Sequence, residues 1–266
     1  TSMDPGNYHI IETGNHPASV LWNSLEVSSV ILLFNNIFSQ GEEYTLSVSG
    51  VEDIAGNAIE TYNIPFLFYG PRPYDIVINE IMADPSPPLQ LPEAEYLELL
   101  NTSNYTINME GWKILAGTSE KDIPKLFLGA GEYLIACHEE DTTLLSLFGR
   151  TLPFSSFSLP NSGQAISLVD RKGRTMFHME YNDGWYQDGD KSEGGGSLEQ
   201  IDPYSPCTGK INWKASSGPY GGTPGYENSV MDANYVAPSL EKCCVINSKM
   251  ITVFFNQKMD SLSLSD

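Results

Sequence analysis

Positive charge is scarce in this 266-residue chain. Its 14 Lys and Arg residues stand against 34 Asp and Glu, which gives a formal net charge of −20. A surface of this kind repels nucleic-acid phosphates and anionic lipid headgroups, so we expect no nucleic-acid partner. The charge does not imply disorder, because hydrophobic residues make up 41% of the sequence and aromatic residues 11%, enough for a packed core.

Long hydrophobic runs are also absent. The longest apolar stretches, residues 30–34 and 64–69, are far shorter than the roughly 20 residues that a membrane-spanning helix needs. We therefore expect no membrane insertion. The first residues lack a basic segment followed by an apolar one, and position 1 is not Met, so we interpret the chain as a piece of a longer protein.

Metal and disulfide signatures are missing as well. The four cysteines, Cys137, Cys207, Cys243 and Cys244, are irregularly spaced without a CxxC pair, so we expect no zinc site. Cys243 and Cys244 should not pair with each other because a bridge between adjacent residues strains disulfide geometry, whereas a Cys137–Cys207 bridge stays open. Neither HExxH nor GxSxG occurs, so the sequence carries no hydrolase motif.

Glycine and proline, by contrast, are plentiful, with 23 and 17 residues, and they separate short runs rich in Val, Ile, Tyr, Phe and Thr. This rhythm is typical of an all-β protein. Helical periodicity is weak, and residues 139–148 are the best candidate for a short helix. The predicted strands are 8–12, 19–22, 29–34, 43–48, 64–69, 76–82, 95–101, 111–115, 132–137, 165–170, 175–181, 197–201, 240–246 and 250–255.

Two linkers divide the predicted strands into three groups. Gly70-Pro-Arg-Pro73 is stiff and has two residues that cannot donate to a β ladder, and residues 228–238 form a second connecting segment. The sequence therefore predicts segments 1–70, 71–235 and 236–266.

Several motifs of the middle segment occur together in a known order. They are Ile78-Asn-Glu-Ile81, Glu95-Tyr-Leu-Glu-Leu-Leu-Asn101, Gly111-Trp112, Leu159-Pro-Asn-Ser-Gly163, Ser197-Leu-Glu-Gln-Ile-Asp-Pro203, Asn212-Trp213 and Gly222-Thr-Pro-Gly225. In this order they resemble the lamin tail domain, an immunoglobulin-like (Ig-like) β-sandwich of nuclear lamins and of many bacterial surface or secreted proteins. The resemblance implies that Asn101 holds a turn and that Trp112 is a core residue on a strand beside residues 95–101.

The flanking segments resemble parts of a bacterial Ig-like repeat. Tyr44-Thr-Leu46 with Asp53-Ile-Ala-Gly-Asn57 is similar to its last strands, and residues 251–260 are similar to its opening strands. Residues 1–70 supply five predicted strands and residues 236–266 supply two, which together make the seven strands of a constant-type Ig sandwich. We expect residues 240–255 to complete the sandwich begun by residues 1–70, within one chain or by strand exchange between chains. Tyr44 should be a corner tyrosine, with an ordinary core tyrosine as the alternative.

Acidic residues offer the first candidate chemistry. Glu80, Glu95 and Glu98 lie on neighbouring predicted strands, where a pair could act as acid and base. Glu95 and Glu98, however, are three residues apart on one strand and so point to opposite faces. We favour a solvated surface for these carboxylates.

A Gly-rich acidic loop and two aromatic residues are the other candidates. Asp188, Asp190 and Glu193 offer the oxygen ligands that Ca²⁺ prefers, although without EF-hand spacing, and a flexible acidic loop is the favoured interpretation. Trp185 and Tyr186 could form a sugar-binding platform, with a lid over the core as the alternative. We expect no cofactor other than this weakly supported calcium.

The expected function is that of a non-catalytic structural or adhesive module in a bacterial cell-surface or secreted multidomain protein. Its partner would be a protein or a glycan at the cell surface. The alternative is a carbohydrate-binding accessory module attached to a larger surface enzyme. Fold resemblance alone does not decide between them.

Overall fold

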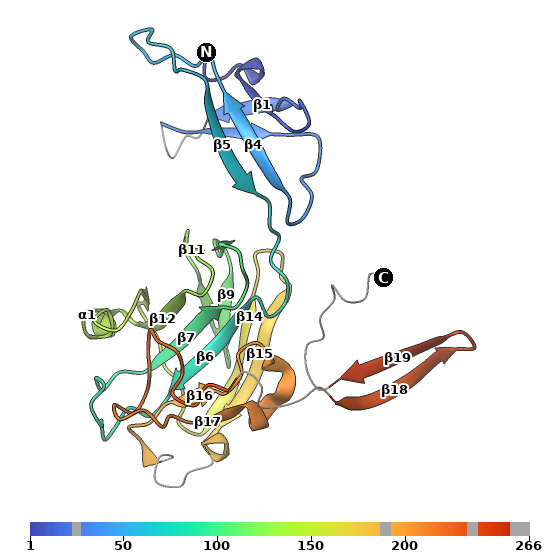
Figure 1. Ribbon diagram of the computed structural model, residues 1–266. Coiled ribbons are helices and arrows are strands. Elements are labelled where there is room, and N and C mark those ends of the chain that lie inside the picture. Colours follow the sequence, from blue (N-terminus) through green and yellow to red (C-terminus); the bar gives the residue numbers. More distant parts are fainter. Residues whose placement is uncertain (23–27, 187–192, 233–238, 256–266) are drawn as a thin grey trace. The chain divides into compact units, whose positions relative to one another are not determined.

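The computed structural model describes residues 1–22, 28–186, 193–232 and 239–255, and it is all-β apart from short helical turns (Figure 1). The chain divides into two compact units, Thr1–Gly70 and Pro71–Asp266. We describe the first as the N-terminal unit. Within the second, residues 71–232 are called the central sandwich and residues 240–255 the C-terminal hairpin.

The N-terminal unit contains two small antiparallel sheets. Its five predicted strands are confirmed, with ends that shift by a few residues. One sheet has the order β1-β4-β5, and the other pairs β2 with β3. Their bounds are β1 Tyr8–Ile10, β2 Ser19–Trp22, β3 Val30–Leu33, β4 Glu43–Val48 and β5 Tyr62–Leu67.

Tyr44 lies at the start of β4 and packs among aromatic rings. Its ring centroid is 5.1 Å from that of Phe38 and 5.8 Å from that of Phe66. The hydroxyl accepts a hydrogen bond of 2.9 Å from the backbone N–H of Ser39, five residues upstream. This is the hydrogen bond that defines a tyrosine corner, so that part of the Tyr44 prediction is confirmed.

The central sandwich is an Ig-like β-sandwich with a six-stranded and a four-stranded sheet. All pairings are antiparallel except that of β12 with β13. The strand order of the six-stranded sheet is β13 (Thr151–Phe154), β12 (Tyr133–His138), β7 (Tyr96–Asn101), β6 (Ile76–Met82), β16 (Leu198–Gln200) and β17 (Trp213–Ala215). The strand order of the four-stranded sheet is β10 (Ser119–Asp122), β9 (Lys113–Ala116), β14 (Gly163–Val169) and β15 (Thr175–Asn182). A separate short pair joins β8 (Ile107–Asn108) to β11 (Phe127–Leu128).

Every residue of β6 and β7 is buried, because these strands occupy the middle of the six-stranded sheet and both of their faces are covered. A β-bulge at Asn79 interrupts their register between Ile78 and Glu80. The bulge changes the alternation, so Glu80 shares a face with Glu98 and not with Leu99, which faces Ile78. The bulge therefore decides which side of the sheet receives the carboxylate of Glu80.

Two residues singled out by the family resemblance take structural positions. Trp112 is 2% exposed, as predicted. The expected neighbour was wrong, because the strand that follows it, β9, pairs with β10 and β14 in the four-stranded sheet and not with β7. Asn101 holds a turn as expected: its side-chain amide donates to the carbonyls of Tyr105 and Leu128.

Helical structure is limited to short turns, consistent with the weak periodicity. The candidate region 139–148 contains one 3-10 turn followed by the only α-helix among the described residues. Within that part of the chain, no helix is long and apolar enough to cross a bilayer. The described turns and helix are η1 Pro5–Asn7, η2 Glu139–Asp141, α1 Thr142–Leu145, η3 Asp183–Trp185 and η5 Pro206–Asn212.

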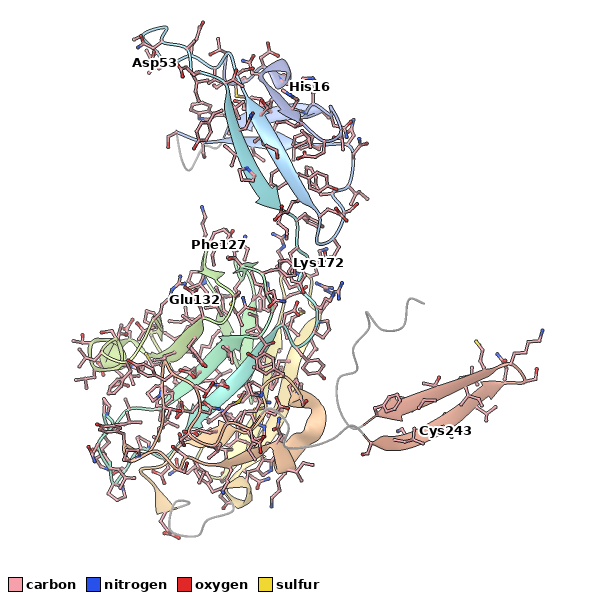
Figure 2. All side chains as sticks on the ribbon, viewed as in Figure 1. His16, Asp53, Phe127, Glu132, Lys172 and Cys243 are labelled. Atoms are coloured by element: carbon pink, nitrogen blue, oxygen red, sulfur yellow. The ribbon has the colours of Figure 1, made fainter. Side chains whose placement is uncertain are left out.

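The C-terminal hairpin consists of β18 (Leu240–Asn247) and β19 (Met250–Phe255), the two strands predicted for the tail. Figure 2 shows its side chains projecting from both faces, with Cys243 labelled on β18. Every residue of β19 is exposed.

Candidate functional site

Three buried glutamates form a row across neighbouring strands of the six-stranded sheet. Glu98 on β7 lies directly opposite Glu80 on β6, which in turn lies opposite Glu199 on β16. All three are 0% exposed. We call this set the glutamate row.

A segment without regular secondary structure, residues 216–230, covers this row, and we call it the strap. The backbone N–H of Thr223 donates to Glu80 Oε1 at 2.8 Å, and that of Gly225 donates to Glu98 Oε2. Glu199 accepts from the Thr223 hydroxyl at 3.0 Å, from the Ser229 hydroxyl at 2.8 Å and from the Val230 N–H. Each of the three carboxylates therefore binds the strap directly.

Side chains of the sheet complete the network around the row. The hydroxyls of Tyr96 and Ser197 donate to Glu80 Oε1, and Asn79 Nδ2 donates to Glu98 Oε1 at 2.9 Å. Asn79 Nδ2 also donates to Asn228 Oδ1 of the strap. Glu80 Oε2 is buried without a hydrogen-bond partner, and none of the salt bridges among the described residues reaches the row.

The row has the electrostatics expected of carboxylates removed from water. Burial, reinforced by the charge of Glu199, raises the pKa of Glu80 to about 7. Burial, reinforced by Glu80, also raises the pKa of Glu98 well above its ordinary value. Both shifts favour the protonated forms of Glu80 and Glu98, and Glu80 Oε2, which has no hydrogen-bond partner, can carry a proton.

The expectation of a solvated surface was thus wrong for Glu80 and Glu98. Sequence spacing correctly separated Glu95 from Glu98, and Glu95 is half-buried, accepting a hydrogen bond of 2.7 Å from the Leu159 N–H. Burial raises its pKa. Glu95 lines a surface pocket of about 400 Å³ together with Glu93, Ala94, Pro85, His138, Glu140, Asp141 and Phe157.

The aromatic candidates do not form an exposed platform. Trp185 is 9% exposed and Tyr186 is 4% exposed, and the ring of Trp185 lies 6.2 Å from that of Trp213. Burial raises the pKa of the Tyr186 hydroxyl. Trp185 and Tyr186 therefore fit the alternative, in which the two rings cover the core.

The calcium candidates lie mostly beyond what the structure describes. Asp188 and Asp190 fall outside the described residues, and Glu193 is exposed. Across residues 1–22, 28–186, 193–232 and 239–255, no group of three or more His, Cys, Asp or Glu residues is arranged to hold a metal ion.

The cysteine predictions have different outcomes. Cys243 and Cys244 are free and exposed, as expected for two residues that do not pair with each other. Cys137 is free and buried, which excludes the Cys137–Cys207 bridge that the sequence left open. Burial raises the pKa of the Cys137 thiol.

Sequence reasoning missed an apolar groove beside the strap. Tyr220 and Tyr226 of the strap are 54% and 65% exposed, and Leu147 after α1 is 79% exposed. Together with Leu91, Phe148, Gly222, Thr223 and Pro224 they line a hollow of about 370 Å³. The available signal was the pair of tyrosines in Gly218-Pro-Tyr-Gly-Gly-Thr-Pro-Gly-Tyr226, a segment too rich in Gly and Pro to be a core strand.

The order of motifs, the sandwich and the buried Trp112 all agree with one family. Residues 71–183 match the Lamin Tail Domain. No curated protein and no solved structure matches the chain. The matched residues include Glu80 and Glu98, whereas Glu199 and the strap come later, yet all of them share one hydrogen-bond network. The packed structure that contains the matched residues therefore continues through the strap, and we call this structure, residues 71–232, the lamin tail module.

Proposed function

We propose that this chain is a non-catalytic structural or adhesive part of a bacterial cell-surface or secreted multidomain protein. The observation that carries the proposal is the use of the glutamate row. Its carboxylates accept three, two and three hydrogen bonds at Glu80, Glu98 and Glu199, all from groups of the module itself. The buried carboxyl groups of the row thus stabilise the fold of the module itself.

The position of the strap gives this network a mechanical consequence. The strap is the last described segment of the module before the chain continues toward the C-terminal hairpin. A pull on that part of the chain would have to break the hydrogen bonds of the glutamate row, which are shielded from competing water. A module built in this way suits a spacer that keeps its fold under tension.

Single-molecule force spectroscopy on the full chain, held at its two ends, tests the proposal. Glu199→Ala should lower the force at which the module unfolds, because three strap groups lose their acceptor. Lys214→Ala is the matched control, since Lys214 is the exposed partner of Glu199 on β17. Equal unfolding forces for the two variants would contradict a tension-bearing role. A hydrolytic activity abolished by Glu95→Gln would contradict the non-catalytic assignment.

The alternative function, a carbohydrate-binding accessory module, is favoured by the groove beside the strap. Exposed tyrosines present an apolar ring and a hydrogen-bonding hydroxyl, the combination that contacts sugars. On a glycan array, the chain should give a hit that disappears with Tyr220→Ala and with Tyr226→Ala. Tyr204→Ala is the control, because Tyr204 is 58% exposed but does not line the groove. Absence of any hit, or a hit unaffected by both groove variants, would reject this alternative.

The flanking segments support placement in a multidomain surface protein. We propose that residues 1–70 and 236–266 are parts of Ig-like repeats on either side of the lamin tail module, as the motifs of the sequence suggest. Immunodetection of the protein in surface, secreted and cytoplasmic fractions of its source cells tests the localisation. Recovery in the cytoplasmic fraction alone would overturn it.

A further inference from the structure

Two histidines lie beside each other on the N-terminal unit. The ring centroids of His9 and His16 are 5.6 Å apart, and their planes are inclined by 40°. His9 is on β1, and His16, labelled in Figure 2, follows in the segment that leads to β2. The neighbours of His9 in β1, Tyr8 and Ile10, are 5% and 1% exposed, so His9 points to the opposite face of the sheet. The pair therefore lies away from the face that carries the core of this unit.

A tight reversal of the chain after β1 brings the two rings together. Gly14 has a φ of +68°, a conformation that favours glycine, and its N–H donates to the Ile10 carbonyl at 2.7 Å. The Ile10 N–H in turn donates to the Asn15 carbonyl at 2.8 Å. The returning chain thus runs beside β1 and places His16 next to His9. Backbone hydrogen bonds fix this arrangement independently of the two imidazoles.

The hydrogen bonding of His16 leaves one of its ring nitrogens open to a metal. Nδ1 lies 2.7 Å from the Tyr8 carbonyl oxygen. Because a carbonyl only accepts, Nδ1 of the neutral ring carries the proton and Nε2 has a free lone pair. Histidines that bind metals generally donate their other ring N–H to a carbonyl or carboxylate in this way. Among the described residues, neither His16 Nε2 nor the His9 ring has a hydrogen-bond partner.

The spacing of the rings fits a single shared ion. With metal–nitrogen bonds of about 2 Å, two imidazoles on one tetrahedral ion have centroids roughly 5 to 6 Å apart. Imidazole suits Zn²⁺, Cu²⁺ and Ni²⁺, whereas Ca²⁺ and Mg²⁺ prefer oxygen ligands. Two imidazoles leave the other positions to water. Such a site differs from one built from three or more His, Cys, Asp or Glu residues, which the described part of the chain does not contain.

The charge of the N-terminal unit favours a cation at this place. Residues 1–70 contain eight Asp and Glu residues and no Lys or Arg, which gives a formal charge of −8. Such a field raises the local concentration of divalent cations. None of the ion pairs among the described residues involves His9 or His16, so both imidazoles are available to a metal.

We propose that His9 and His16 form a surface site for one divalent transition-metal ion. His16 Nε2 and one ring nitrogen of His9 are the protein ligands, and water fills the remaining positions. Nitrogen ligands of this kind bind Cu²⁺ more tightly than Zn²⁺. The ion links β1 to the returning chain, and because it binds only the folded arrangement, it stabilises the N-terminal unit. This site is independent of the roles proposed for the lamin tail module.

Calorimetric titration of the full chain with zinc chloride tests the site. Cys243 and Cys244 are changed to Ser throughout, because exposed thiols bind zinc themselves. This chain should bind one Zn²⁺ that His9→Gln or His16→Gln weakens by about tenfold or more. His178→Gln is the matched control, since His178 is an exposed histidine of the lamin tail module, and it should leave that affinity unchanged. Absence of zinc binding, or equal weakening in all three variants, would overturn the proposal.

Nuclear magnetic resonance of the same chain with all its histidines in place separates metal binding from any effect of the variants on folding. A small proportion of Cu²⁺ should broaden the imidazole C–H signals of His9 and His16 together, because both rings bind the paramagnetic ion. The signals of His138 and His178 should stay sharp. Before copper is added, the ¹⁵N shifts of His16 should show the proton on Nδ1. Broadening of all four imidazoles alike, or of only one ring of the pair, would overturn the shared site, and so would a proton on His16 Nε2.

Discussion

The N-terminal unit and the lamin tail module are built from similar short antiparallel strands, but the carboxyl groups with shifted pKa values lie in opposite environments in the two regions. In the module, the strap covers the outer face of the six-stranded sheet, and burial raises the pKa values of Glu80 and Glu98. In the N-terminal unit, Glu12 and Asp53 are exposed and their pKa values are lowered. A hydrogen bond from the Thr45 N–H lowers the pKa of Glu12, and one from the Asn57 side chain lowers that of Asp53.

The comparison shows that alternation along a strand does not fix burial by itself. Strand β5 of the N-terminal unit alternates as a sandwich strand should, yet Tyr62 and Ile64 remain exposed because nothing in the described unit covers them. In the module, even a glutamate is enclosed, because the strap supplies hydrogen-bond donors to it. Four variants or conditions test this difference, in decreasing order of expected magnitude.

The largest effect is expected from truncation of a tryptophan. Trp112→Ala should reduce the free energy of unfolding of the module by about 3 to 5 kcal/mol, since Trp112 is 2% exposed. Trp22→Ala in the N-terminal unit is the matched change at a side chain that is 51% exposed, and it should cost much less. Urea denaturation of both variants measures the two losses. Equal losses of unfolding free energy would mean that Trp112 is no better packed than Trp22, which would contradict the comparison.

The second test is the pH dependence of the module. The folded-state pKa of Glu80 is about 7 against an ordinary value of 4.5, and that of Glu98 is also raised. A raised carboxyl pKa contributes stability that is complete below about pH 4.5 and is lost as the pH rises through 7. For Glu80 the loss is roughly 3 kcal/mol, so the module should be less stable at pH 8.5 than at pH 5.5.

In a Trp22→Phe background, urea denaturation followed by tryptophan fluorescence isolates this transition, because the remaining Trp112, Trp185 and Trp213 lie in the module. Glu80→Gln should flatten the profile, since the amide cannot ionise. The exposed carboxylates Glu12 and Asp53 predict the opposite slope for the N-terminal unit, whose stability should fall as the pH drops below their ordinary values. Parallel pH profiles for the two units would contradict the comparison.

A third, smaller effect should come from the close fit of the strap. A Cβ added at Gly222 would lie 2.6 Å from both Glu80 Oε1 and the Tyr96 hydroxyl and 2.8 Å from Leu91 Cδ1. Gly222→Ala should therefore cost about 2 kcal/mol through overpacking. Gly218→Ala is the control in the same segment, where the nearest atom would be the Ser216 hydroxyl at the longer distance of 3.2 Å. Thermal melts that do not separate the two variants would show that the strap can shift away from the row.

The smallest effect concerns the corner of the N-terminal unit. Tyr44→Phe removes the acceptor of the Ser39 N–H and should cost about 1 kcal/mol. Tyr62→Phe is the control, because that side chain is 62% exposed. A loss no larger than the control, measured by chemical denaturation of the N-terminal unit, would favour the alternative of an ordinary core tyrosine.

Local sequence patterns were sufficient to predict the all-β class, the approximate positions of the strands, the boundary at Gly70 and the burial of Trp112. Each of these depends on local chemistry. Gly and Pro end strands at turns, and β-branched and aromatic residues favour strands. The burial of Trp112 was implied by the Gly-Trp pair of the family pattern. It also indicated correctly that Cys243 and Cys244 do not pair with each other. These features can be predicted without knowing which strands pair with each other.

The direction of the glutamate side chains, by contrast, depends on contacts between distant parts of the chain. In regular alternation Glu80 would share a face with Ile78, but the bulge at Asn79 turns its side chain to the face of Glu98 and Glu199. A bulge depends on the pairing between strands, and burial depends on the strap, which arrives from more than 130 positions later in the chain, as the 143-residue separation of Thr223 from Glu80 shows. Neither the bulge nor the strap can be recognised in the local sequence pattern, so Glu80 and Glu98, which the sequence predicted to be solvated, lie buried beneath the strap.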